Sequence, residues 1–188
     1  MAELPFPSSG GVFEAFLERV RFSPNARVNT DWLVDCLGIS QRTNAGRTLH
    51  WLNAAGIVAM DGRLTQSGRQ LLRVPPDSEF RAAALQALET LIKPRRLAKL
   101  RSKELSRSGL RVELSNEFDV KTNQANKAIA GLRVLAEASG DSVLTEALGR
   151  PTFERHRPNE PQLDLVEGKQ AVVARFQLFC GKTGGIDG

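Results

Sequence analysis

The sequence predicts a mainly α-helical protein with one or two small β-hairpins. Apolar residues recur every three or four positions along most of the chain, and this spacing places them on one face of a helix. Glycine and proline separate these stretches, and a short polar corner joins two predicted helices at two places in the chain. The 188 residues are 41% hydrophobic and 25% charged, which is the ordinary range for a globular protein with its own core.

Three helices are expected near the N-terminus. The apolar residues of the stretch Val12–Val20 predict a short amphipathic helix. We expect Thr30 to cap a second helix, because its hydroxyl can accept a hydrogen bond from the first turn, and Gly38 to end that helix. Ser40 is expected to cap a third helix that runs from about residue 41 to residue 54.

The third predicted helix has an apolar and a polar face. The inward residues are Ala45, Thr48, Leu49 and Leu52. The outward residues are Gln41, Arg42, Asn44, Arg47 and His50. Trp51 flanks the inward face, and we expect it to be structural.

A hairpin is expected directly after this helix. Two short runs, residues 57–60 and 63–65, flank Asp61-Gly62, and Asp-Gly suits a type I′ turn. Arg63 would lie at the tip of this hairpin. Thr65 is expected to cap a short helix.

The order of these elements resembles a winged helix-turn-helix. The pattern LGIS, a polar helix, LNAAGIV, DGRLT and QSGRQLL is similar to the winged-helix domains of bacterial transcription regulators, in which L-T-x-x-G closes the wing. The resemblance covers about residues 12–73, so residues 1–75 are predicted to form one domain. It implies that the helix after Ser40 enters DNA and that the hairpin lies beside it as the wing.

A basic helical connector is predicted over residues 76–110. Its first helix carries an apolar stripe from Phe80 to Leu91, and Pro94 begins or kinks the next helix, for which Gly109 is a plausible end. Residues 93–133 hold 11 basic and 4 acidic side chains, a net charge of +7 within a total of +5 for the chain. We expect phosphate contacts from Arg95, Arg96 and Lys99.

A second helix-turn-helix-like module is predicted over residues 111–150. A helix ends near Phe118, Asp119 and Val120 form the corner, and Thr122 caps a helix that extends to about residue 138. Residues 141–146 offer one short strand without a clear partner. The outward residues are Thr122, Asn123, Gln124 and Lys127, for which DNA contact and plain solvent exposure both remain open.

A proline-rich linker and a C-terminal docking segment are predicted over residues 151–188. Asp164, Glu167 and Lys169 resemble the D…E-x-K arrangement of metal-dependent nucleases, but the spacing between the acids and the proline-rich surroundings argue against a nuclease site. Cys36 and Cys180 are expected to be buried reduced thiols.

We do not expect an enzyme. The chain has two histidines, no tyrosine, and neither a phosphate-binding glycine loop nor a nucleophile elbow. No catalytic residue, metal or cofactor is therefore predicted.

Sequence-preferring binding of double-stranded DNA is the predicted function, with transcription regulation as its main use and a role in replication or defence as a variant. Arg42 or Arg47 would pair with guanine, Gln41 or Asn44 with adenine, and Arg63 with phosphate or the minor groove. The alternative is a non-enzymatic winged-helix adaptor subunit of a larger nucleoprotein complex.

The expected partners besides DNA are a second copy of the chain or another protein, bound through the 80–91 helix or the C-terminal segment. The sequence has no apolar run long enough to span a membrane and no secretion signal. We therefore expect a cytoplasmic, nucleoid-associated protein.

Overall fold

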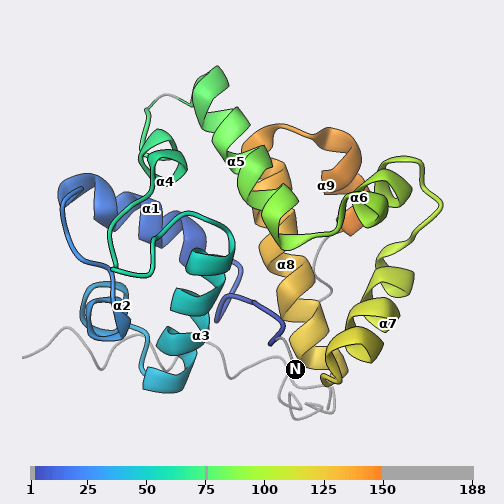
Figure 1. Cartoon of the computed structure of the whole chain (residues 1–188), viewed down its shortest axis with the longest axis horizontal. Coiled ribbons are helices and arrows are strands. Elements are labelled where there is room, and N and C mark those ends of the chain that lie inside the picture. The colour runs from blue at the N-terminus through green and yellow to red at the C-terminus, as the bar shows by residue number, and fades with distance from the viewer. Residues whose placement is uncertain (1–2, 75, 150–188) are drawn as a thin grey trace, which may run out of the picture. The chain divides into compact units, whose positions relative to one another are not determined.

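The computed structural model describes residues 3–74 and 76–149, and within them the protein is mainly helical (Figure 1). These residues form nine helices. The predictions for residues 151–188, including Asp164, Glu167, Lys169 and Cys180, lie outside the described residues. The helices of the described part are α1 (Val12–Phe22), α2 (Thr30–Leu37), α3 (Arg42–Ala54), α4 (Gln66–Gln70), α5 (Ser78–Leu91), α6 (Pro94–Arg101), α7 (Arg107–Phe118), α8 (Thr122–Ser139) and α9 (Ser142–Leu148).

The helix starts differ from the prediction by one residue at three places. Thr30 is the first residue of α2 and not its cap, because Asn29 is extended and its side chain accepts the Trp32 N–H at 2.8 Å. Ser40 does not cap α3, since the corner is one residue longer and Gln41 takes the cap position. Similarly, Thr122 opens α8 after Lys121.

The segment after α3, where a hairpin was expected, folds back on itself through a single antiparallel bridge. Val58 and Leu64 form an isolated antiparallel bridge, and the described residues contain no longer strand. The type I′ turn predicted for Asp61-Gly62 is wrong. That turn needs positive φ at both residues, whereas Gly62 alone of the two has it, at 82°. The Gly62 N–H instead bonds to the Ala59 carbonyl at 2.9 Å, so the glycine follows the turn.

The hairpin is attached to the chain before α2. The Val28 N–H donates to the Gly62 carbonyl at 2.7 Å. A Cβ atom at Gly62 would lie 2.8 Å from the Val28 carbonyl oxygen, so this approach needs glycine as well as its positive φ. Thr65 caps α4 as predicted, because its hydroxyl accepts the Gly68 N–H at 2.9 Å.

The second half of the described chain is built around α8. This helix packs against α5, α7 and α9, and α4 packs against α5. Gly109 does not end a helix: it lies in the first turn of α7, where its N–H donates to the Ser106 hydroxyl at 3.2 Å. The strand predicted over residues 141–146 is also wrong, because Asp141 caps α9 by accepting the Leu144 N–H.

The chain before α1 is part of the core, although it forms no helix. Leu4, Phe6 and Pro7 are buried, and the Ser8 N–H donates to the buried Thr48 hydroxyl at 3.0 Å. Figure 1 shows this N-terminal segment, residues 3–9, passing between α3 and α8. It therefore connects the helices of the two predicted modules.

Helix α5 was predicted to form a dimer contact through its exposed face. The buried residues of α5 include Phe80, Ala84 and Leu88, and they face into the core. Its exposed residues are polar or small, namely Ser78, Glu79, Arg81, Ala82, Gln86, Glu89 and Thr90. Among the described residues, none of the helices combines the length and the apolar composition of a membrane span.

Candidate nucleic-acid interface

The corner before α3 fixes the direction in which this helix leaves the core. Gly38 ends α2 in the left-handed conformation, with φ 64° and ψ 28°, and Ile39 returns to the core with 9% of its surface exposed. Ala45, Thr48 and Leu52 on α3 are then fully buried. Trp51 joins them with 1% of its surface exposed, as expected for a structural role.

The corner before α8 repeats this arrangement with one residue fewer. Asp119 ends α7 in the left-handed conformation, with φ 50° and ψ 50°, and the half-buried Val120 follows it. Because Asp119 is not glycine, its backbone carries some strain, although aspartate tolerates this region better than most residues. Ala125, Ala128 and Ile129 then turn one face of α8 into the core.

The predicted contact residues of α3 are only partly free. Gln41, Arg42 and His50 are exposed, whereas Asn44 and Arg47 are half-buried. Arg42 forms an ion pair with Asp31 of α2. Both side chains are more than half exposed, so the pair contributes little stability and can exchange for another anion.

Two amides make local hydrogen bonds at the starts of the two helices. The Asn44 side chain donates to the Gln41 side chain at 3.1 Å. At the start of α8, the Gln124 side chain accepts the Lys121 backbone N–H at 3.2 Å. Thr122 and Asn123 remain exposed beside it.

Phe6 brings the two helices together. The Arg47 guanidinium of α3 lies over its ring at 5.7 Å from the centroid, and the Lys127 ammonium of α8 lies 6.0 Å from the same centroid. The two cations are therefore no more than about 12 Å apart. In Figure 1, α3 and α8 both begin at the lower side of the described chain and run upward from it.

The sequence interpretation missed this role of the N-terminal segment. The residues Leu4-Pro5-Phe6-Pro7 alternate apolar side chains with proline, which suits an extended segment that packs without backbone hydrogen bonds. This alternation was the sequence signal that could have indicated a packed N-terminal segment. Nothing in it indicates that Phe6 meets two cations that are 41 and 121 positions further along the chain.

Acidic residues neutralise much of the positive charge of the basic connector. The Arg96 side chain is 16% exposed, and it contacts Glu113 at 2.7 Å and Glu117 at 2.6 Å. Lys93 also pairs with Glu117, while Arg101 and Lys103 pair with Asp141 and Glu146.

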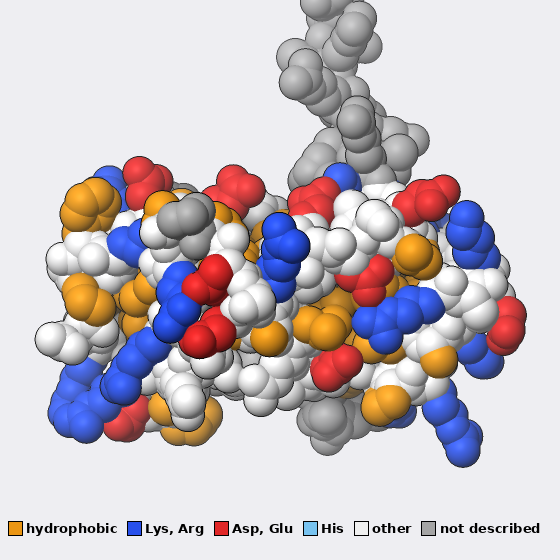
Figure 2. Space-filling view, turned by 90° about the horizontal axis from the view of Figure 1, so that it is seen from above, with side chains coloured by type: hydrophobic (Ala, Val, Ile, Leu, Met, Phe, Trp, Pro, Cys, Tyr) orange, Lys and Arg blue, Asp and Glu red, His pale blue; other side chains and the backbone are white. Residues whose placement is uncertain are grey.

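Two predicted phosphate contacts of the connector remain unpaired. Arg95 and Lys99 are exposed and form no ion pair with the described residues. Figure 2 shows Lys and Arg side chains interspersed with Asp and Glu over one face of the protein. The net charge of +7 over residues 93–133 therefore does not translate into one large patch of a single sign on that face.

The ion pairs also shift the ionisation of one carboxylate. The hydrogen bond from the Lys93 ammonium lowers the pKa of Glu117 below its ordinary value, and Arg96 adds to this effect. Glu117 therefore keeps its negative charge to a lower pH than an unpaired glutamate does, and it pairs with both cations.

The tip of the hairpin is exposed. Met60 has 90% of its surface exposed, and the Arg63 side chain, 63% exposed, lies 3.7 Å from Asp61. Among the described residues, no group of three or more histidine, cysteine or acidic side chains is arranged to hold a metal ion.

No protein-family model, curated protein or solved structure matches the chain.

Proposed function

We propose that the protein binds double-stranded DNA through one surface made by the first two turns of α3 and α8. The observation that carries this proposal is the convergence of Arg47 and Lys127 on Phe6, at the side of the protein where both helices begin. A helix N-terminus is favourable for an anion, because its free N–H groups and its dipole both attract negative charge.

The order of the N-terminal elements supports a winged helix. Two helices joined by a left-handed glycine corner precede the Val58–Leu64 hairpin, and the Val28–Gly62 hydrogen bond adds the contact that a third short strand would make. In such a domain α3 is the helix that enters the major groove, and Arg63 at the hairpin tip contacts phosphate or the minor groove.

The residues have different roles in this proposal. Arg42 and Gln41 are exposed at the start of α3, and Asn123 and Thr122 at the start of α8. We assign base reading to these four residues. Arg47 and Lys127 carry the charge between the two helices. In the connector, Arg95 and Lys99 fit phosphate better than Arg96, which two glutamates already hold.

Regulation of transcription remains the proposed use of this binding. A dimer would present two copies of the surface to a palindromic site. The polar exposed face of α5 offers little apolar area for such a contact, so the segment after residue 149 is the preferred candidate for it.

The experiment compares charge removal on this surface with charge removal elsewhere. The double variant Arg47→Gln/Lys127→Gln keeps long side chains over Phe6 but removes both positive charges. The control, Arg19→Gln/Arg81→Gln, removes two exposed charges from α1 and α5. Binding to a fluorescent duplex of random sequence is measured by anisotropy over a range of salt concentrations.

The expected result is a change in salt dependence. Each phosphate contact contributes about 0.9 to the slope of log K against log salt, so the first variant should lose about 1.8 from that slope. The control should keep the slope of the unchanged protein. An equal loss in both variants, or no binding by the unchanged protein at low salt, would refute the proposed surface.

A protein-binding adaptor is the second candidate. It is favoured by the exposure of Phe22, Met60 and Val74, which have 80%, 90% and 69% of their surfaces exposed. An adaptor that binds through these apolar residues would lose its partner when they are changed to serine and would respond weakly to salt.

A further inference from the structure

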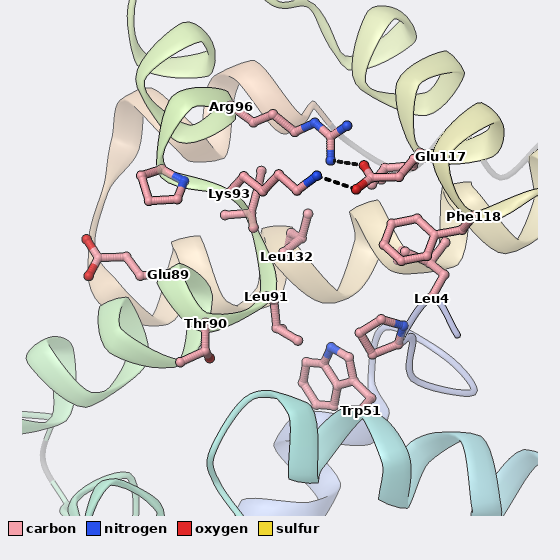
Figure 3. A pocket seen from close by; sticks show the side chains of 15 residues that line it. Leu4, Trp51, Glu89, Thr90, Leu91, Lys93, Arg96, Glu117, Phe118 and Leu132 are labelled. Carbon is pink, nitrogen blue, oxygen red and sulfur yellow. Dashed lines mark hydrogen bonds and ion pairs between the residues drawn. The ribbon is translucent and has the colours of Figure 1, made fainter. Parts of the chain in front are cut away.

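A pocket of about 320 Å³ lies between α3 and the helices that follow it (Figure 3). It is lined by the end of α5, the start of α6, parts of α7 and α8, and the N-terminal segment. Most of the lining is apolar, with Leu4, Leu91, Phe118 and Leu132 among the side chains that face it. This size and composition fit a small organic molecule, because ligand sites combine an apolar wall with a few placed polar groups.

The indole N–H of Trp51 is one such polar group. Trp51 has 1% of its surface exposed, and Phe13 packs edge-on against its ring with the centroids 5.8 Å apart. Figure 3 shows the ring nitrogen directed toward the pocket. The described residues supply no acceptor for this N–H, so it is open to a hydrogen bond from within the pocket. A ligand atom that lies in the pocket can accept this hydrogen bond.

The opposite end of the pocket carries charge. Lys93 and Arg96 both meet Glu117 there, as the dashed lines of Figure 3 show. Arg96 is held between two glutamates and is mostly buried, whereas the Lys93 side chain is 67% exposed. Lys93 can therefore leave Glu117 for another carboxylate while Arg96 keeps Glu117 paired.

Glu89 is the other acidic residue that lines the pocket, and it does not repel an anion bound near Lys93. Figure 3 shows the Glu89 carboxylate directed away from the Lys93–Glu117 pair.

We propose that this pocket binds a small, mainly apolar carboxylic acid that carries a second hydrogen-bond acceptor at its other end. The acceptor bonds to the Trp51 N–H, the apolar body contacts Leu91, Phe118 and Leu132, and the carboxylate meets Lys93. This site is independent of DNA binding. Nevertheless, the ligand would contact Trp51, which lies one turn after Arg47 on α3. It would also contact Leu4, which lies on the same N-terminal segment as Phe6.

Binding can be measured from the NMR signal of the Trp51 indole N–H. The chain has two tryptophans, so the protein labelled with ¹⁵N gives two indole N–H signals, and Trp32→Phe assigns the one from Trp51. The probe is 4-acetylphenylacetate, which has a carbonyl oxygen at one end and a carboxylate at the other. The first control probe, 4-ethylphenylacetate, lacks the carbonyl oxygen, and the second, 4-acetylphenylacetamide, lacks the charge.

The expected result is a saturable downfield shift of the Trp51 signal with 4-acetylphenylacetate, while the Trp32 signal stays in place. Each control probe should bind about tenfold more weakly, because it loses one charged or hydrogen-bonded contact. Lys93→Gln should reduce the affinity for the acid to that for the amide and leave the amide unaffected.

A matched pair of variants locates the site. Leu91→Phe fills the pocket and should abolish the shift, whereas Leu85→Phe adds the same ring elsewhere on α5 and should preserve it. A Trp51 signal that does not move at millimolar probe, or a shift that persists in Leu91→Phe, overturns the site. Equal affinities for the three probes overturn the assigned ligand class.

Discussion

Replacing Gly131 with alanine tests the seating of the N-terminal segment on α8. A Cβ atom at this position would lie 2.8 Å from Pro7 Cδ and 3.0 Å from the Trp51 ring nitrogen. Neither neighbour can move easily, because Pro7 is rigid and both residues are buried. The same substitution at Gly46 of α3 meets nothing within 4 Å and serves as the matched control.

The two variants should shift the free energy of unfolding in opposite directions. Alanine in a helix interior is favoured over glycine by about 1 kcal/mol, and both variants gain this term. Overpacking a core costs about 1–3 kcal/mol, and only Gly131→Ala carries this cost. We therefore expect Gly46→Ala to stabilise the protein by up to about 1 kcal/mol and Gly131→Ala to destabilise it by about 1 kcal/mol.

Urea unfolding followed by circular dichroism measures this difference. With a urea dependence of about 2 kcal/mol per molar, each midpoint should move by about 0.5 M. Removing the opposing ring with Pro7→Ala should make the cost of Gly131→Ala smaller, which a double-mutant cycle detects. If Gly131→Ala raises the midpoint as much as Gly46→Ala does, Pro7 does not pack on α8 and the reasoning is refuted.

Two further predictions concern buried and charged contacts of the same region. Thr48→Val should lower the free energy of unfolding by about 1–3 kcal/mol, since the part-buried Ser8 N–H loses its acceptor; an unchanged urea midpoint would contradict this. Because the pKa of Glu117 is lowered in the folded state, its stabilising contribution is present above the unfolded pKa and is lost as the pH falls through the folded value. Thermal unfolding in acid should therefore show a smaller loss for Glu117→Gln than for the unchanged protein, and parallel pH curves would speak against the Lys93 and Arg96 pairing.

Most of the helices could be predicted because their signals are local. The apolar stripe of α8 places Ala125, Ala128 and Ile129 inward whatever the rest of the chain does, and the same holds for Ala45 and Leu52 of α3. The capping residues were harder to predict, and three of the predicted caps lie one residue from the observed ones. A hydroxyl or amide within one position of a helix start can serve equally well in the sequence, and only the backbone angles decide between them.

The arrangement of the candidate surface could not be predicted, because its contacts are distant in the sequence. Phe6 has no periodic pattern around it, so nothing local indicates that Arg47 would lie over its ring. Arg96 was predicted to contact phosphate from its place in a basic run. The spacing of Glu113 and Glu117, four apart on one face of α7, was the signal that this run would meet acidic partners.

The most direct test of the shared DNA-binding surface is a titration of the ¹⁵N-labelled protein with duplex DNA, followed by backbone amide signals. We predict that the signals of residues 41–47 on α3 and residues 121–127 on α8 shift together, with the same dependence on DNA concentration. The signals of α5 and α9 should stay in place. Shifts in only one of the two helix starts, or in neither, would contradict a single surface formed by α3 and α8.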